Sequence, residues 1–430
     1  MPPLPKRAGS SLRRVLWIAL ILASSFFCYS SVLQIPRVTH GFAMYYAYAR
    51  LVIDGEDFTK TFDPEYFNSK LRTYGIVGIT DVPNNPPTAA FAMMPLAWLR
   101  PETAKIVWGI CSILFAALSV RFLLQIYRVS PVENVGLGLM ILVLLWKPLY
   151  AAIELGQIYP LLLLLFTLSL NGLKKSRQLL TAVPVSASII LKGYGIIPFL
   201  WFALEKRWKL FGLTLLGISV LVAVSLSVFS PDVWTMYFSM AGHSLGRNPS
   251  DAHVAYQTIN GFLRHLLSYH EEWSPYPLSD ISEAALIATS ILCNLLLIAF
   301  VLRRASMATE QDSLLSYSAL LAASVLAAPL AEEYHFVLFI PLAIGMSAGI
   351  VRSWNSEGEL DVKGAVFLVA LLLMILPLGY KGLNAARFPL VLVAYPRLYS
   401  GLAMIIVFGL RSRGRPTTEE LMDNRSIAGS

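Results

Sequence analysis

The chain has 430 residues, of which 56% are hydrophobic and only 14% charged. Soluble domains carry about a quarter charged residues, so the composition excludes an ordinary soluble protein and indicates a polytopic membrane protein. The formal net charge of +8 does not indicate a nucleic-acid partner, because the basic residues flank apolar runs. These runs recur along the whole chain without a long polar linker, which predicts one membrane domain.

The first predicted element is an apolar run at 15–33, close to the roughly 20 residues that a spanning helix needs. Similar runs lie at 104–126, 132–150, 158–173, 210–229, 284–302, 314–330, 336–351, 365–380 and 390–410. The stretch 179–204 contains Lys-Gly-Tyr-Gly at 192–195, which predicts two short helices that meet at a polar elbow. The chain is therefore predicted to be an all-α polytopic membrane protein with about 12 transmembrane helices.

The N-terminal run has the basic head and apolar core of a signal peptide, but its length and the parity of the later spans favour a retained signal anchor. Cys28, Cys111 and Cys293 all fall inside predicted helices. We interpret them as small core residues, because neither a disulfide nor a metal-ligand spacing is visible.

Short loops rich in Lys and Arg face the cytoplasm. The basic clusters near the N-terminus and at 174–177, 205–209, 303–304 and 411–415 fall on one side only if the stretch 179–204 crosses the membrane twice. The same count requires that the apolar stretch 88–99, which follows the turn Pro-Asn-Asn-Pro-Pro at 83–87, not cross.

This topology predicts a cytoplasmic N-terminus at 1–13, a membrane domain at 14–411 and a disordered cytoplasmic tail at 412–430. Large external loops are expected at 37–103 and 230–281. We therefore expect a multi-pass plasma-membrane protein with both termini in the cytoplasm.

All six histidines are external or at the outer membrane edge under this topology, which predicts chemistry on the outer side; they are His40, His243, His253, His265, His270 and His335. The short cytoplasmic loops have no phosphate-cradling glycine motif, so no nucleotide-sugar site is evident there. No cofactor and no metal cluster are predicted. The reactive partner is expected to come from the membrane.

Six stretches occur in the order and spacing of the landmarks of one enzyme family; they are HGFAMYYAYARLVIDG (40–55), NNPPTAAFAMMPLAWL (84–99), GQIYPLLLLLFTLSL (156–170), LKGYGIIPFLWF (191–202), YQTINGFLR (256–264) and EEYHFVLFIPLAI (332–344). With these stretches the chain resembles glycosyltransferase family 87 from about residue 14 to residue 410. The resemblance implies a GT-C type membrane fold whose external first loop carries interfacial helices.

The resemblance also implies an activity. Such enzymes move a sugar, here a hexose and by family type mannose, from a polyprenyl-phosphate donor to a lipid-linked or glycan acceptor on the outer face, usually with inversion. A phosphate leaving group needs positive charge or hydrogen-bond donors, and the acceptor hydroxyl needs a nearby base. Membrane lipids are expected partners, whereas a nucleic acid is not.

The sequence departs from the family at the expected base. Many members carry Asp directly before the aromatic stretch that follows the first helix, but here that position is Gly41. Another loop carboxylate could replace it, His40 could serve, or transfer activity could be lost. Asp81, beside the proline-rich turn, is the first substitute, and Asp63 is the second, although Asp before Pro is also a common helix-cap signal.

Two further residues match family landmarks. His335 follows two acids at the start of a late helix and is either a functional imidazole oriented by acid or a helix-capping residue. Lys192 lies at the predicted elbow, where a cation is costly unless it meets an anion. A donor phosphate and a structural ion pair with Glu154 or another loop acid are both open for Lys192.

The remaining candidates are predicted to contact substrate. Gln257 and Arg264 fall in the external landmark, where sugar or phosphate contacts and a plain helix surface are both open. Gln157 faces either the cavity or another helix. For Tyr45 and Tyr46, followed by Tyr48, an interfacial aromatic belt is favoured over sugar stacking.

Two other classes fit parts of the pattern. A transporter or lipid flippase would also be polytopic and would suit a charged elbow, but no inverted repeat of that elbow is visible in the second half. A catalytically silent family member is the other alternative, and Gly41 favours it.

Overall fold

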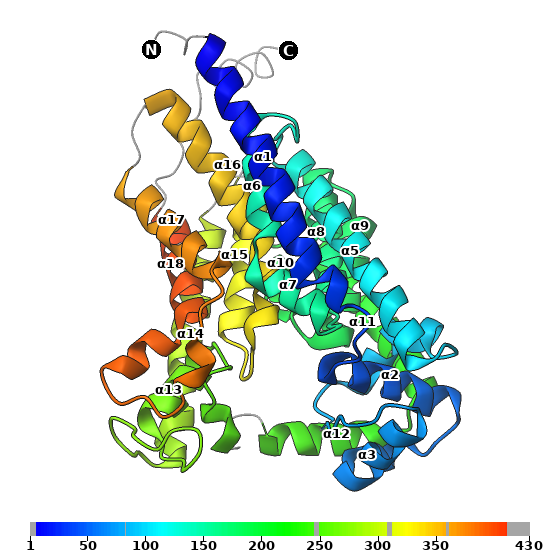
Figure 1. Cartoon of the computed structure of the whole chain (residues 1–430). Coiled ribbons are helices and arrows are strands. Elements are labelled where there is room, and N and C mark those ends of the chain that lie inside the picture. Colours follow the sequence, from blue (N-terminus) through cyan, green and yellow to red (C-terminus); the bar gives the residue numbers. More distant parts are fainter. Residues whose placement is uncertain (1–5, 82, 245–248, 308–311, 358–360, 411–430) are drawn as a thin grey trace.

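The computed structural model describes residues 6–81, 83–244, 249–307, 312–357 and 361–410 (Figure 1). In these ranges the chain forms helices and connecting segments and no β-strand. The predicted all-α polytopic class is confirmed. The tail expected at 412–430 lies outside the described residues.

Five helical segments are long and apolar enough to cross a membrane within the described ranges; they are Ser11–Gln34, Pro101–Ile126, Trp208–Val228, Glu283–Ser306 and Glu333–Trp354. They correspond to α1 (Lys6–Ser30) with the short η1 (Val32–Gln34), α5 (Pro101–Ile126), α11 (Trp208–Val228), α14 (Glu283–Ser306), and η6 (Glu333–Phe339) with α16 (Ile340–Glu357). The remaining predicted spans form shorter apolar helices, so the count of 12 stays a prediction.

The run at 132–150 is not one straight helix. It divides into α6 (Asn134–Leu144) and α7 (Lys147–Glu154), which are bent by 47°. Pro148 lies in the first turn of α7, where its missing amide N–H costs nothing, so a new helix begins there. The other shorter helices are α8 (Tyr159–Lys174), α15 (Ser313–Leu326), α17 (Val362–Ile375) and α18 (Pro396–Leu410).

The predicted elbow is present. α9 (Gln178–Lys192) ends and α10 (Ile196–Leu204) begins around it. Gly193 adopts a left-handed conformation with φ of +79°, which terminates α9. At Gly195 a Cβ atom would lie 2.7 Å from Ile189 and 2.9 Å from the Val185 carbonyl oxygen, so only glycine lets the returning chain pack this closely on α9.

Several basic residues lie at one end of the bundle, whereas the predicted basic cluster at 411–415 lies outside the described residues. Lys174, at the end of α8, donates a hydrogen bond of 2.9 Å to the Gln125 carbonyl near the end of α5. Arg352 of α16 contacts the neighbouring Tyr127 carbonyl. Residues of the loops at 174–177 and 205–209 line one shared pocket, which fits a stretch 179–204 that leaves this end and returns to it.

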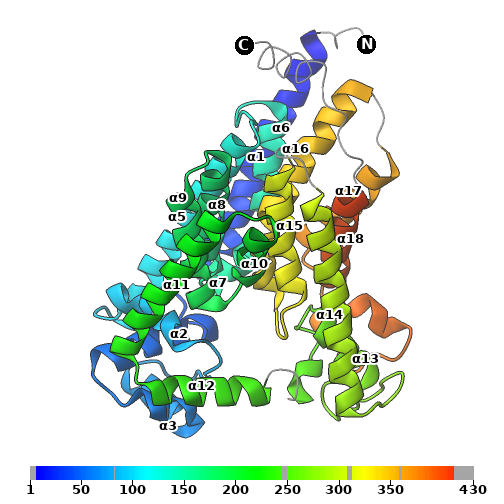
Figure 2. The same ribbon diagram turned by 180° about the vertical axis from the view of Figure 1, so that it is seen from behind.

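The opposite end carries the non-spanning elements (Figures 1 and 2). On one side lie α2 (His40–Ile53), η2 (Phe58–Phe62) and α3 (Pro64–Thr73), and on the other lie η5 (Pro249–Ala252), α13 (Ile259–Leu267), η7 (Tyr380–Gly382) and η8 (Leu390–Ala394). α12 (Pro231–Ser244) lies between them, across the direction of the bundle.

The stretch 88–99 does not form a spanning helix, as predicted. It contains only η3 (Pro87–Ala89), α4 (Ala90–Met93) and η4 (Met94–Leu96), of three, four and three residues. The Thr88 hydroxyl donates a 2.6 Å hydrogen bond to the Ile190 carbonyl, which ties the start of this stretch to the end of α9.

Two expectations about side-chain placement are wrong. An aromatic belt would expose its rings at the lipid headgroups, but Tyr45, Tyr46 and Tyr48 are 0%, 2% and 0% exposed. They are buried because α2 packs against neighbouring helical segments, with Phe67 of α3 against Tyr48. Cys28 is not a core residue but is exposed on α1.

Candidate functional site

Lys192 lies at the elbow and contacts groups that carry no charge. Its Nζ donates to the side-chain oxygen of Asn85, in the proline-rich turn, and lies 5.8 Å and 5.7 Å from the ring centroids of Tyr45 and Tyr159. In the described residues it forms no ion pair. Glu154, its expected alternative partner, instead offers its carbonyl oxygen to Lys105 at 2.8 Å.

The turn that carries Asn85 is fixed against α2. The Tyr48 hydroxyl donates to the Asn85 carbonyl at 3.3 Å, and the Asn85 amide nitrogen lies 3.1 Å from the Met44 sulfur. Asn85 is only 2% exposed. The polar turn at 83–87 is therefore built into the wall beside Lys192.

Three tyrosines surround His335. The ring centroids of Tyr159, Tyr334 and Tyr194 lie 4.4 Å, 4.7 Å and 6.0 Å from that of the imidazole. Tyr159 begins α8, Tyr194 belongs to the elbow, and Tyr334 lies in η6. Because Tyr159 also faces Lys192, these rings join Lys192 and His335 into one site, which we call the tyrosine–histidine cluster.

His335 is oriented by backbone rather than by a carboxylate. Its Nδ1 donates to the Glu332 carbonyl oxygen at 3.1 Å. The carboxylates of Glu332 and Glu333 have other partners. The expected orientation of the imidazole by a carboxylate is therefore not what His335 shows, since its partner is a backbone oxygen, and a functional role for His335 stays a prediction.

The two adjacent acids differ in environment. Glu333 is 6% exposed and accepts two hydrogen bonds from Arg397, at 2.9 Å and 2.5 Å, with Lys147 at 3.8 Å. Glu332 accepts one hydrogen bond of 3.0 Å from the Tyr334 hydroxyl. Glu333 therefore belongs to a buried ion pair, whereas Glu332 borders the tyrosine–histidine cluster.

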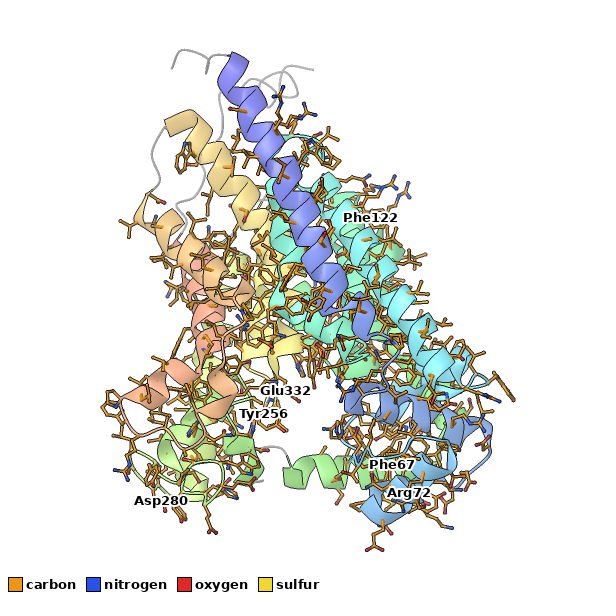
Figure 3. The ribbon with its side chains drawn as sticks, viewed as in Figure 1. Phe67, Arg72, Phe122, Tyr256, Asp280 and Glu332 are labelled. Carbon is orange, nitrogen blue, oxygen red and sulfur yellow. The ribbon has the colours of Figure 1, made fainter. Side chains whose placement is uncertain are left out.

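The pKa of the Glu332 carboxyl group is raised overall, although several effects oppose one another. Burial raises the pKa of its carboxyl group, while the charges of Lys381 and Lys192 and the hydrogen bond from Tyr334 lower it. Tyr256, from the segment before α13, lies beside Glu332 (Figure 3). Burial, with added effects of Glu332 and Asp251, raises the pKa of Tyr256 to about 12.

Asp81 and His40 lie together at the edge of the site. The His40 Nδ1 donates to the Thr80 carbonyl at 3.0 Å, and the Asn68 side chain holds the Asp81 backbone with bonds of 2.8 Å and 3.2 Å. Burial raises the pKa of Tyr45, and the negative charge of Asp81 raises it further. Asp81 therefore acts electrostatically on the same tyrosine that faces Lys192.

Asp63 and Tyr46 form hydrogen bonds to backbone groups of the fold. Asp63 is exposed and caps α3, with its carboxylate accepting from the Glu65 amide at 2.9 Å. The Tyr46 hydroxyl donates to the Leu99 carbonyl at 2.7 Å. The structure brings neither of them into contact with the tyrosine–histidine cluster.

Gly41 and Gln157 pack against each other. A Cβ atom on Gly41 would overlap the Gln157 amide nitrogen and would lie 2.9 Å from the Leu155 carbonyl oxygen. The Gln157 oxygen accepts a 3.1 Å hydrogen bond from the Tyr45 hydroxyl, so the amide pairs α2 with the start of α8. The space that a side chain at position 41 would need is therefore filled.

Gln257 and Arg264 are engaged within the protein on the other side of the site. The Gln257 side chain donates to the Val254 and Ala394 carbonyls at 2.6 Å and 2.9 Å, and its backbone amide donates to Ala331 at 2.9 Å. Arg264 forms a 2.5 Å ion pair with Glu283. Gln257 thus anchors the residue before Glu332.

The described residues contain no group of three or more His, Cys, Asp or Glu side chains that could hold a metal ion. Lys192 supplies a cationic side chain to the tyrosine–histidine cluster. A phosphate bound there would therefore be met by Lys192 and by hydrogen-bond donors such as the tyrosine hydroxyls.

The comparisons with known proteins address the family. The model of glycosyltransferase family 87 matches residues 84–332, which is more than half of the chain. The chain belongs to glycosyltransferase family 87. No curated protein matches it.

This glycosyltransferase is a membrane protein with a sugar donor and an acceptor as substrates. The matched segment contains the turn with Asn85, the elbow with Lys192, and Glu332 at its last position. Asp81 and His40 lie before it, as does Gly41.

Several residues of the cluster were not singled out by the sequence. Tyr159, Tyr194 and Tyr334 have no special spacing in the sequence, and the sequence around Asn85 indicates only a turn. The sequence also does not distinguish Glu332 from the adjacent Glu333. The sequence feature that could have indicated these neighbours is Lys192 at the elbow, since a cation inside the membrane requires polar or aromatic neighbours.

Proposed function

We propose that this membrane glycosyltransferase moves a hexose, with mannose as the first candidate, from a polyprenyl-phosphate donor to a lipid-linked or glycan acceptor. The observation that carries the proposal is the environment of Lys192. An ammonium group held at a helix break, bonded to an amide, facing two tyrosine rings and without an ion pair among the described residues, suits a phosphate leaving group.

The proposed reaction is a single displacement with inversion. The acceptor hydroxyl attacks the anomeric carbon, its proton passes to a carboxylate, and the bond to the donor phosphate breaks as Lys192 stabilises the leaving oxygen. A carboxyl group with a raised pKa is a suitable general base, and this favours Glu332. Asp81 is the second candidate, and His335 would orient or hydrogen-bond the sugar.

The active site is proposed to face the outside of the plasma membrane, with both termini in the cytoplasm. Support comes from α8, which begins at Tyr159 of the cluster and ends at Lys174, beside the loops at 174–177 and 205–209. Cytoplasmic loops rich in Lys and Arg are the usual arrangement.

Purified protein in proteoliposomes tests the reaction. With radiolabelled polyprenyl-phosphate mannose and a membrane-lipid acceptor extract, we expect a labelled product. Lys192→Gln should lower its rate of formation about 100-fold or more, because removing one group that stabilises transition-state charge typically has an effect of that size. Lys175→Gln, which removes an exposed lysine at the basic end, is the control.

The same vesicles separate the alternatives. If labelled donor crosses the bilayer and no glycosylated product forms, the protein is a transporter. If neither occurs with mannose, glucose or galactose donors, it is a silent family member. Normal turnover by Lys192→Gln would contradict the phosphate-binding role of Lys192.

A further inference from the structure

An apolar groove on the bundle is lined by none of the residues of the tyrosine–histidine cluster. It encloses about 770 Å³ between α1, α5, α6 and α7, which is within the range of about 300–1,000 Å³ typical of ligand pockets. Of its lining residues only Ser24, Arg121 and Gln125 are polar. The groove borders the first predicted span, α1, whose outer face is largely exposed.

The length and position of the groove match one leaflet. On α5 it extends from Ile113 to Gln125, which is about 18 Å of helix, against about 15 Å for the hydrocarbon of one leaflet. Its far end is the basic end of the bundle, because Lys174 donates to the carbonyls of Gln125 and Ile126. In the proposed orientation this is the cytoplasmic leaflet.

Arg121 sets the charge of the groove. It is exposed, lines the groove about one and a half turns before the end of α5, and forms no ion pair or hydrogen bond within the described part of the chain. An arginine at this depth is costly unless its head meets an anion or reaches the interface. A phosphate above an acyl chain supplies an anion at this point.

We propose that the groove binds one anionic glycerophospholipid of the cytoplasmic leaflet, with an acyl chain between α1 and α5 and the phosphate on Arg121. This lipid is distinct from the donor and acceptor of the proposed reaction. The proposal does not rest on that reaction, and only the choice of leaflet rests on the proposed orientation.

Native mass spectrometry of the full chain tests the site, with phosphatidylglycerol and phosphatidylcholine of identical acyl chains as probes. We expect one phosphatidylglycerol to bind about fivefold more tightly than phosphatidylcholine, since one basic residue near an anionic lipid surface contributes about that factor. Arg121→Gln should abolish the preference, and Arg121→Lys should retain most of it. Ala117→Phe, which fills the groove, should weaken binding of both lipids.

Arg128→Gln is the matched control, because Arg128 is an exposed arginine at the same end of α5 that does not line the groove. It should bind both lipids as the unmodified protein does. An unchanged preference in Arg121→Gln would overturn the proposal, as would an equal loss in Arg128→Gln. Tighter binding of a polyprenyl phosphate than of phosphatidylglycerol, lost in Ala117→Phe, would also overturn it.

Discussion

Adjacent residues in this protein perform different tasks because of partners that are distant in sequence. Glu333 is paired with Arg397 and Lys147, whereas Glu332 borders the tyrosine–histidine cluster and accepts a hydrogen bond from Tyr334. The same logic applies to Gly41, whose missing side chain is explained by the amide of Gln157.

Glu332 should determine the acidic limb of the pH–rate profile. Burial raises the pKa of its carboxyl group above the ordinary value of 4.5, so the base becomes protonated and inactive at a higher pH than an exposed glutamate would. We expect Glu332→Gln to lower kcat/KM about 100-fold or more and to remove this limb. Steady-state kinetics across pH 4 to 8 measure both effects.

Stability separates loss of the base from misfolding. A carboxyl group whose pKa is raised on folding stabilises the fold below its unfolded pKa, near 4.5, and this contribution is lost as the pH rises through the higher folded value. At neutral pH Glu332→Gln should therefore unfold at the same temperature as the unmodified protein or higher. If Asp81→Asn removes the acidic limb and Glu332→Gln does not, Asp81 is the base.

Position 41 should reject a side chain. In Gly41→Ala the new Cβ overlaps the Gln157 amide and approaches the Leu155 carbonyl, so we expect a loss of about 1–3 kcal/mol in the free energy of unfolding. Thermal unfolding in detergent measures it. The double variant Gly41→Ala with Gln157→Ala should recover part of this loss, because it removes the overlap with the amide and leaves only the carbonyl. No recovery would mean that Gln157 is not the obstacle.

The elbow between α9 and α10 fixes the position of Lys192. Gly193 ends α9 in a left-handed conformation, and Gly195 lets the returning chain pack on α9. The Thr88 hydroxyl ties the proline-rich turn to the same helix end. Together these contacts bring Asn85 to Lys192.

The two glycines of the elbow should respond differently to alanine. At Gly193 the nearest atom to a new Cβ is 4.0 Å away, so Gly193→Ala should cost only the left-handed backbone, about 1–2 kcal/mol. Gly193→Asn should cost less, because asparagine tolerates this conformation. Gly195 has an ordinary φ, but in Gly195→Ala the new Cβ would lie 2.9 Å from the Val185 carbonyl oxygen. We expect a loss of product formation there that Gly193→Asn does not show, and equal losses in both would contradict this account.

Composition and the lengths of the apolar runs were sufficient to predict the helical membrane class and most helix positions. The elbow was predictable because Lys-Gly-Tyr-Gly breaks an apolar run in one place. The bend between α6 and α7 was not predicted, although Pro148 marks it, because a proline in an apolar run is compatible with a continuous span. The pairing of Glu333 with Arg397 and of Gly41 with Gln157 depends on tertiary contacts, which no local pattern encodes.

The membrane topology of the bundle is itself a prediction that can be tested. The parity argument requires that α9 and α10 leave the basic end and return to it, so positions 175 and 209 should lie on the same side of the membrane and position 279 on the other. Single cysteines replacing the exposed residues Lys175, Lys209 and Ser279 can be labelled in intact cells with a membrane-impermeant maleimide. We expect Ser279→Cys to react at once, and Lys175→Cys and Lys209→Cys only after permeabilisation.

The native Cys28, Cys111 and Cys293 lie within helices, and the unmodified protein measures their background. Labelling of Lys209→Cys without permeabilisation, with Lys175→Cys still protected, would mean that 179–204 crosses once. The loops at 174–177 and 205–209 would then lie on opposite sides, which is incompatible with the pocket that they line together. Because Lys192 lies at the turning point of this stretch, the same result would move it away from the outer face, and the proposed donor site would fail with it.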